Sequence, residues 1–242
     1  MALHLGSALG LGAEAGPVYP ARMPRKKKPA PFTTEEATDL FARLAEVRPD
    51  PQTELDYVNP FTLVVAVALS AQATDVGVNK ATRRLFELAD TPEKMVALGE
   101  DAIRDHIKTI GLFRNKAKNV FALSKMILDD FGGDVPQTRE ELERLPGVGR
   151  KTANVVMNEA FGAPTIAVDT HIFRVSNRTN LAPGKNPLEV ELKLEKIIPG
   201  QYLKGAHHWL ILHGRYTCKA RKPDCGNCAI ADLCRYDEKT PA

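Results

Sequence analysis

Four cysteines gathered near the C-terminus constrain this chain more than any other feature of its sequence. The chain has 242 residues, and its cysteines all fall between positions 218 and 234 with the spacing C-x6-C-x2-C-x5-C. Disulfides that stabilise a secreted protein usually join segments that are far apart in the sequence, and this spacing is too short for that. The pattern instead indicates one metal or cluster site in a protein that keeps its thiols reduced.

The number and spacing of the thiols favour one kind of site. Four cysteine thiolates at short spacing are typical ligands of a [4Fe–4S] cluster. Zinc also takes four tetrahedral thiolates, but such zinc sites usually pair two C-x2-C motifs, and this chain has only one. The sequence therefore predicts a [4Fe–4S] cluster, with a zinc site as the alternative, on Cys218, Cys225, Cys228 and Cys234.

The distribution of charge says more about nucleic-acid binding than its total does. The chain carries 33 basic and 30 acidic side chains, and residues 1–31 hold five of the basic ones and one acidic one, so the remainder is close to neutral. A nucleic-acid partner would need basic groups gathered on one face. Residues 204–222 contain no acidic side chain. We expect the loop after the first cysteine to contact DNA phosphates, the alternative being a solvated loop over a structural metal site, and its cations are Lys219, Arg221 and Lys222.

Hydrophobic periodicity from Thr33 onward predicts an all-α protein. Residues 1–31 are rich in Ala, Gly and Pro and predict a disordered basic tail. The run Phe61–Leu69 is rich in β-branched residues, but no partner strand follows it, so we expect a buried helix there. This run is also far shorter than the roughly 20 apolar residues that cross a bilayer. After a capped start at Thr33, further helices are expected at 79–88, from Thr91, and at 100–109, 116–131, 139–145 and 150–161.

The most informative segment is LPGVGRKTAN, which runs from residue 145 to residue 154. Its proline stops a helix, its glycines allow positive φ and close approach of the backbone, and a second helix begins near Arg150. The free N–H groups of that helix would bind a phosphate without reading base sequence. A plain helix–helix turn is the simpler alternative. The whole string favours a DNA-binding hairpin, with contacts from Gly147, Val148, Gly149, Arg150 and Thr152.

Lys151 lies in the first turn of that second helix. The positive end of the helix dipole and the neighbouring Arg150 both disfavour an ammonium, so we expect the pKa of Lys151 to be lowered. A neutral amine is a nucleophile and forms Schiff bases at suitable carbon centres. Contact with a phosphate as a simple positive charge is the alternative, and position alone does not decide between the two.

Asp169 precedes another helical run, so its simplest role is the N-cap of that helix. A carboxylate that faces a cleft also takes a proton from a lysine or stabilises a cationic sugar, and these roles are compatible with capping. His171 follows two residues later. It is a candidate for assisting at DNA, although we expect it to pack or to form a hydrogen bond.

Together these segments resemble the endonuclease III family, which are bifunctional DNA glycosylase/AP lyases of the helix-hairpin-helix superfamily. The resemblance covers nearly everything from about Thr33 to the C-terminus. It implies two helical domains with DNA in the cleft between them. One would be a six-helix barrel at 53–163, and the other an iron–sulfur domain formed by 32–52 and 164–242. The matching segments are 69–75, 145–156, 165–178, 208–214 and the cysteine loop.

The resemblance also implies the chemistry. Lys151 matches the catalytic lysine that attacks C1′ of an oxidised pyrimidine nucleotide in duplex DNA, and Asp169 matches the catalytic aspartate. A Schiff base results, and β-elimination then cuts the strand on the 3′ side. Gln72 matches the residue that fills the space left by the flipped nucleotide, and Leu112 matches a wedge beside the opposite strand. A helix-capping amide and a core leucine are the plainer alternatives for these two.

Three other functions fit these residues less well. A monofunctional adenine glycosylase of the same superfamily lacks the hairpin lysine and carries an extra C-terminal domain, for which this chain has no room. A non-catalytic damage-sensing or redox-sensing DNA-binding protein needs neither Lys151 nor Asp169, and a ferredoxin-like carrier does not explain the hairpin. We therefore expect a monomeric DNA-repair enzyme of the bacterial cytoplasm, associated with the nucleoid and not with a membrane.

Overall fold

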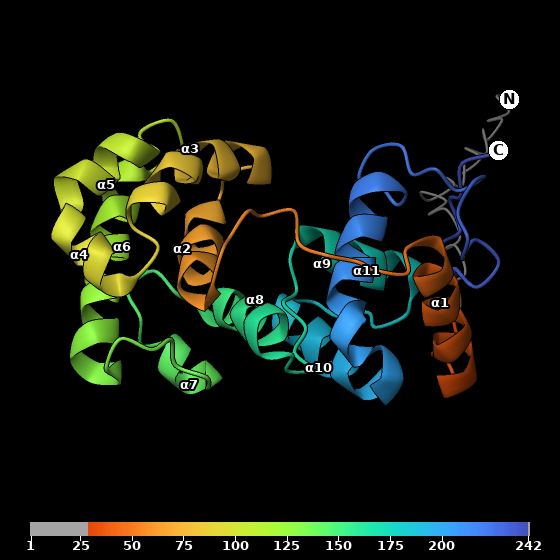
Figure 1. Cartoon of the computed structure of the whole chain (residues 1–242). Coiled ribbons are helices and arrows are strands. Elements are labelled where there is room, and N and C mark those ends of the chain that lie inside the picture. The colour runs from red at the N-terminus through yellow and green to blue at the C-terminus, as the bar shows by residue number, and fades with distance from the viewer. Residues whose placement is uncertain (1–28, 242) are drawn as a thin grey trace, which may run out of the picture.

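The computed structural model describes residues 29–241, and this part of the chain consists of helices joined by turns and loops (Figure 1). It contains no strand, which confirms the predicted all-α class. The tail predicted for residues 1–31 lies outside the described residues, except for positions 29–31. None of the described helices is long and apolar enough to pass through a membrane. The helices are α1 (Thr34–Val47), α2 (Pro60–Ser70), α3 (Asp75–Leu88), α4 (Pro92–Leu98), α5 (Glu100–Ile107), α6 (Phe113–Phe131), α7 (Arg139–Leu142), α8 (Arg150–Phe161), α9 (Thr170–Thr179), α10 (Pro187–Ile197), the 3₁₀ turn η1 (Gly200–Tyr202) and α11 (Leu203–Tyr216).

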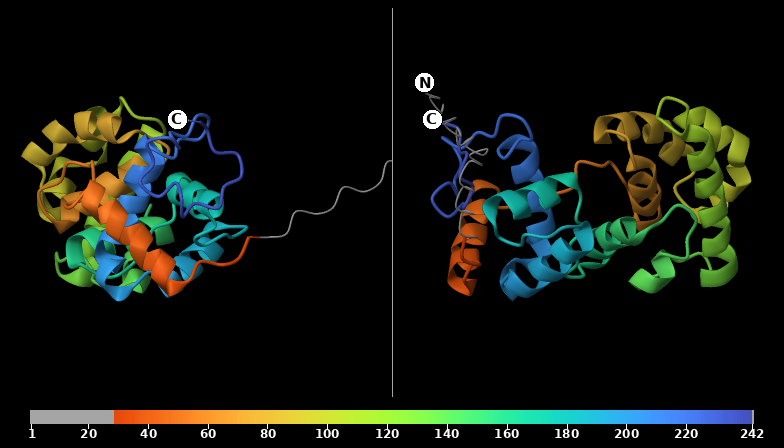
Figure 2. Two further views of the ribbon diagram at one scale, coloured as in Figure 1. Left: turned by 90° about the vertical axis from the view of Figure 1, so that its right-hand side faces the viewer. Right: turned by 180° about the vertical axis from the view of Figure 1, so that it is seen from behind.

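The helices pack around two separate hydrophobic cores. The first lies among α2–α8 and includes the fully buried Leu63 and Leu123. The second lies among α1, α9–α11 and the cysteine loop, and includes the fully buried Phe41. Figure 1 shows the two groups at opposite ends of the molecule with α8 between them, and the view from behind in Figure 2 shows the same separation. The chain passes between the groups twice, along 48–59 and along 162–169.

The helix α2 shows why the β-branched run does not form a strand. Asn59 and Thr62 form a capping box at its start, and Pro60 occupies the first turn. Eight of its eleven residues are buried, and it contacts α3, α6 and α8. A helix that is surrounded by protein needs no polar face, so its burial outweighs the weak helix preference of valine. The predicted buried helix is therefore confirmed.

Some helix boundaries differ from those predicted. The helix α3 begins at Asp75, four residues earlier than expected, because Thr74 caps it by accepting a hydrogen bond from a first-turn N–H at 3.1 Å. The helix α6 begins at Phe113, directly after a left-handed Leu112, rather than at residue 116. The last residues predicted for the helices now labelled α5 and α7 lie in turns instead.

An aromatic cluster organises the second core. Phe41 of α1 stacks on Tyr202 with ring centroids 6.0 Å apart, and Trp209 of α11 packs against both rings. The Trp209 indole N–H also donates a hydrogen bond to the Arg48 carbonyl at 2.8 Å, just after α1 ends. The cluster therefore fixes the first helix against the last one.

Truncation of this cluster is expected to destabilise the fold. Phe41 is fully buried, so Phe41→Ala should lower the free energy of unfolding by about 3–5 kcal/mol. Val47 lies on the same helix but is 62% exposed, and Val47→Ala should change this free energy by less than about 0.5 kcal/mol. Urea denaturation followed by circular dichroism measures both effects. Equal losses in the two variants would contradict the role given to the cluster.

Candidate active site and metal centre

A pocket lies at the boundary between the two cores. It holds about 600 Å³ of empty space, part of which is continuous with solvent. Lys151, in the first turn of α8, and Asp169, immediately before α9, both line it. The remaining walls come from the α1–α2 linker, the end of α2, the start of α3 and one face of α11. The structure thus brings the two predicted catalytic residues to one place.

Asp169 is the N-cap of α9, as predicted. Its Oδ1 accepts a hydrogen bond from the Ile172 N–H at 2.7 Å. No hydrogen bond or ion pair among the described residues uses the second carboxylate oxygen. Lys151 is exposed and forms no ion pair with any carboxylate in the described part of the chain. The amine and the carboxylate therefore share the pocket without being bonded to each other.

The hairpin before α8 uses its two glycines differently. Gly147 has a φ of +81°, and a Cβ added there would lie 2.9 Å from the Asn119 amide nitrogen. Gly149 is the N-cap of α8 with an extended φ of −102°, and an added Cβ would meet no heavy atom of the described chain within 4 Å. Within the described residues, no side chain caps α8 and no acidic residue stands in its first turn. Its first N–H groups are therefore open to an anion.

Two of the predicted hairpin contacts are engaged within the protein. Val148 is only 5% exposed and packs into the first core. The Arg150 guanidinium donates a hydrogen bond to the Glu191 carboxylate of α10 at 2.6 Å, and that carboxylate is almost fully buried. Arg150 thus joins the two cores, a role that the predicted DNA contact did not include. Thr152 is half-buried in the first turn of α8.

Gln72 and Leu112 share an uncommon backbone conformation. Both lie in exposed turns and have left-handed φ values of +56° and +58°. Residues other than glycine pay about 1–3 kcal/mol for such positions, which cluster at functional sites. Leu112 is 59% exposed and is therefore no core leucine. No hydrogen bond among the described residues uses the Gln72 side chain, so Gln72 is no capping amide either.

His171 is placed away from the pocket. Its half-buried ring has Nδ1 3.2 Å from Nη2 of Arg174. Its Cβ lies against Gly214 of α11, where an added Cβ would come within 2.9 Å. His171 therefore packs and hydrogen-bonds, as expected, and its other candidate role, a contact with DNA, stays a prediction.

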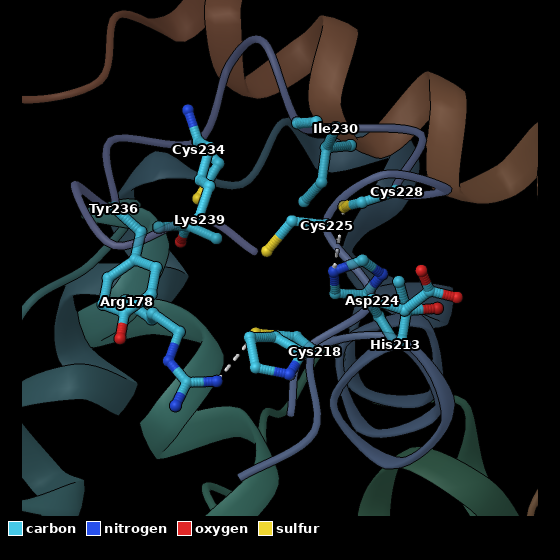
Figure 3. A pocket seen from close by; sticks show the side chains of 14 residues that line it. Arg178, His213, Cys218, Asp224, Cys225, Cys228, Ile230, Cys234, Tyr236 and Lys239 are labelled. Carbon is cyan, nitrogen blue, oxygen red and sulfur yellow. Dashed lines mark hydrogen bonds between the residues drawn. The ribbon is translucent and has the colours of Figure 1, made fainter. Parts of the chain in front are cut away.

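The four cysteines surround one cavity of about 350 Å³ beside α9 and α11 (Figure 3). Arg178 donates to the Cys218 Sγ at 3.6 Å, and His213 Nε2 lies 3.8 Å from the Cys228 Sγ. Burial is the main cause that raises the pKa of the Cys228 and Cys234 thiols. The four cysteines line one cavity, part of which is continuous with solvent, and a guanidinium lies beside one of the sulfurs. These residues fit a cluster held by four thiolates.

The basic loop after Cys218 is held by two arginines of α9. Arg174 donates to the carbonyls of Cys218 and Gly214 at 3.1 Å and 2.7 Å. Arg178 donates to the carbonyls of residues 219 and 220 at 2.7 Å and 2.9 Å. These bonds fix the main chain and leave the side chains of the loop outside. The exposed cations, which form no ion pair with a described residue, are Lys219, Arg221 and Lys222.

Comparison with known proteins decides the family. Residues 65–200 match the model of the HhH-GPD superfamily base excision DNA repair proteins, and residues 218–234 match the iron-sulfur binding domain of endonuclease III. The chain is 58% identical to endonuclease III of Escherichia coli (strain K12) over 201 residues, which cover 83% of this chain and 95% of the relative. This chain belongs to the endonuclease III family. Endonuclease III of Haemophilus influenzae is 59% identical over the same shares of each chain.

A solved structure supports the same assignment. It is described as a trapped endonuclease III–DNA covalent intermediate and is 47% identical, with a TM-score of 0.79 over 84% of this chain and 96% of that one. As an endonuclease III relative, the protein is a base-excision-repair DNA glycosylase/AP lyase, binds DNA and carries a [4Fe–4S] cluster. The iron–sulfur match decides against the zinc alternative. The family decides against an adenine glycosylase, a mere damage sensor and a ferredoxin-like carrier.

Several ion pairs between the two cores were not predicted from the sequence. Arg215 of α11 pairs with Asp75 of α3 at 2.8 Å and also with Glu54 of the α1–α2 linker. His208 of α11 lies 3.2 Å from the Glu159 carboxylate of α8. The members of each pair are far apart in the sequence and belong to no motif. A single sequence therefore offers no signal for them.

The two hairpin glycines should respond differently to alanine. Gly147→Ala combines a positive φ with a clash against Asn119, so it should lower the free energy of unfolding by about 1–3 kcal/mol. Gly149→Ala meets open space at an ordinary φ, so it should cost about 0.5 kcal/mol through the weaker N-cap. Urea denaturation of the two variants beside the parent measures both values. A larger loss at Gly149 than at Gly147 would refute this description of the hairpin.

His207 of α11 should make stability depend on pH. It is 2% exposed, and its pKa is lowered to about 3, first by burial and then by the nearby His208 and Lys151. The unfolded histidine takes up a proton near pH 6.5 and the folded one does not, so this stabilisation is complete above pH 6.5 and is lost as the pH falls toward 3. Between pH 7 and pH 5 the free energy of unfolding of the parent protein should fall by about 2 kcal/mol more than that of its His207→Leu variant. Chemical denaturation at both pH values measures the difference, and parallel losses would contradict it.

Proposed function

We propose that this endonuclease III relative removes oxidised pyrimidines from duplex DNA through a Schiff base on Lys151 and then cuts the strand. The observation that carries the proposal is that Lys151, on α8 of the first core, and Asp169, at the start of α9 of the second, line one pocket. Lys151 is the one amine in the described lining of that pocket. The related structure is described as a trapped covalent intermediate with DNA, which supports a covalent step here.

The chemistry starts with a proton transfer. The oxygen of Asp169 that is not used in capping takes a proton from the Lys151 ammonium, and the neutral Nζ attacks C1′ of the damaged nucleotide. The Nζ–C1′ bond forms as the C1′–N1 bond breaks, and the electron pair leaves with the base. The C1′–O4′ bond then breaks as the C1′=Nζ double bond forms, and one proton passes from the nitrogen to the ring oxygen, which leaves a protonated Schiff base. This imine acidifies the C2′ proton, and loss of that proton expels the 3′ phosphate by β-elimination.

The proposed DNA-binding face combines the hairpin, the two turns that contain Gln72 and Leu112, and the basic loop after Cys218. The open N–H groups at the start of α8 suit a phosphate, and Gly149 lets the strand come close to them. The exposed Leu112 suits insertion between bases, and Gln72 suits filling of the vacated space. Further phosphate contacts are proposed for Gly147, Thr152, Lys219, Arg221 and Lys222.

We propose that all four cysteines hold the cluster. Cys218, Cys225, Cys228 and Cys234 would be its ligands, because they line one cavity with their sulfurs free of disulfides. When bound, the cluster supplies a rigid attachment for the basic loop. None of these cysteines lines the Lys151 pocket, so the proposed role of the cluster is to position the loop.

We also propose the domain boundaries, the oligomeric state and the cellular location of the protein. We place a helical-barrel domain at 53–163 and an iron–sulfur domain at 32–52 with 164–242, because the two hydrophobic cores divide in this way. Both proposed catalytic residues come from one chain, so a monomer is sufficient. A chromosomal DNA substrate and a set of free thiols favour the bacterial cytoplasm and its nucleoid as the place of action.

Covalent trapping tests the nucleophile. The parent should form a borohydride-stable protein–DNA complex on a duplex with one oxidised thymine, whereas Lys151→Ala should form none, because it lacks the amine. Lys151→Ala should still bind the duplex to within about threefold, since the phosphate contacts are made elsewhere. Denaturing gels and a binding titration measure the two results. Strand cleavage or a trapped complex with Lys151→Ala would show that another amine is the nucleophile.

A further inference from the structure

The candidate pocket contains one buried polar side chain that the mechanism above does not use. His207 of α11 lines the pocket with Lys151 and Asp169 and is 2% exposed. Its Nδ1 is fully buried and has no hydrogen-bond partner among the described residues. Burying a polar nitrogen without a partner costs free energy, so such a group in a binding pocket indicates a ligand that completes it.

The neighbouring histidine shows the contrast. His208 also lines the pocket, but its Nε2 lies 3.2 Å from the Glu159 carboxylate, which satisfies it. The two rings meet edge to face with centroids 5.0 Å apart. Burial and the positive charge of nearby groups keep the pKa of His207 low, so its ring is neutral at pH 7. A neutral imidazole offers one N–H donor and one acceptor.

Nearly every other polar side chain of the pocket wall already has a partner within the protein. The unpartnered groups are the Lys151 amine, one oxygen of Asp169 and the His207 ring. The first two are assigned to the sugar. The partnered pairs are Gln52 with Asp50, Thr53 with the Leu55 N–H, Ser70 with the Val67 carbonyl, Asp75 and Glu54 with Arg215, and His208 with Glu159. His207 is therefore the group left for the base.

The pocket wall also restricts how a base is recognised. Its described lining contains no Phe, Tyr or Trp, so a flipped base is not sandwiched between aromatic rings. A thymine oxidised across its 5,6-bond is no longer planar and stacks poorly, but it keeps the carbonyl oxygens and the N3–H of its pairing edge. A wall of this kind must recognise such a base by hydrogen bonds to that edge.

We propose that the neutral His207 imidazole donates a hydrogen bond to a carbonyl oxygen of the extruded damaged pyrimidine and stabilises the negative charge that develops as the base departs. The inference rests on the proposed function. In the step concerned, the Lys151 Nζ–C1′ bond forms, the C1′–N1 bond breaks, and the electron pair moves onto the base, where the carbonyl oxygens share it. His207 keeps its proton throughout, and the departing base takes a proton from water.

The test separates base release from strand cleavage. His207→Leu removes the hydrogen bond at similar volume, and His207→Gln keeps an N–H donor. Single-turnover rates are measured on a duplex with one oxidised thymine and on the same duplex with a preformed abasic site. His207→Leu should slow base release by about 10- to 100-fold and leave cleavage of the abasic duplex within about threefold. His207→Gln should recover a substantial part of the lost rate.

Controls separate a local effect of His207 from a loss of folded, active protein. Borohydride trapping on the abasic duplex gives the active fraction of each preparation, and His207→Met serves as the apolar variant if His207→Leu does not fold. His106→Leu, on α5 and outside the pocket, should match the parent on both substrates. Unchanged base release in the apolar variant, or equal losses on both substrates, would overturn the inference. A parent that neither releases the base nor forms a trapped complex through Lys151 would instead overturn the proposed function.

Discussion

Charged side chains that join the two cores help to fix the position of one core against the other, and the pocket lies between them. Hydrophobic packing is non-directional and holds each core together without fixing one against the other. The Arg150–Glu191 pair fixes them on one side, with hydrogen bonds as short as 2.6 Å to a carboxylate that is almost fully buried. Removal of Arg150 would leave this buried carboxylate with the Arg139 guanidinium, whose Nη1 lies 3.9 Å away, as its remaining positive partner. Because Lys151 directly follows Arg150, the residue that anchors the start of α8 also places the proposed nucleophile.

The helix α9 connects two parts of the protein that otherwise look unrelated. Its N-cap is Asp169, which lines the pocket, and two arginines within it, Arg174 and Arg178, donate to main-chain carbonyls of the loop next to the cysteines. A ten-residue helix spans about 15 Å and is stiff over that length. Under the proposed function, a loop that the cluster holds on DNA would thereby be kept in register with the carboxylate in the pocket. The proposed cluster would then act on the pocket without any cysteine lining it.

Features that depend on neighbouring residues were predictable from the sequence, and features that depend on distant ones were not. The all-α class, the buried helix α2, the start of α8 at Arg150 and the capping role of Asp169 all follow from local patterns. The partner of Arg150 lies 41 residues away and Glu54, one of the two partners of Arg215, lies 161 residues away, so neither pair leaves a pattern in the chain. The lack of a partner for His207 likewise depends on residues that come together only in the folded pocket, so the sequence does not show it. The start of α3 was predicted four residues too late, because the amphipathic pattern begins at residue 79 whereas the helix begins directly after its cap, Thr74.

Under the proposed function, extrusion of a nucleotide and recognition of its base are carried out by different parts of the protein. Gln72 and Leu112 hold strained backbone conformations in exposed turns, and contacts with DNA offset that strain only when the duplex is bound. Inserted side chains and phosphate contacts act on any sequence, so they do not distinguish damaged bases from intact ones. The discrimination then falls to the pocket. A wall without aromatic rings gains nothing from a planar base, and this favours pyrimidines whose oxidised rings have already lost their stacking.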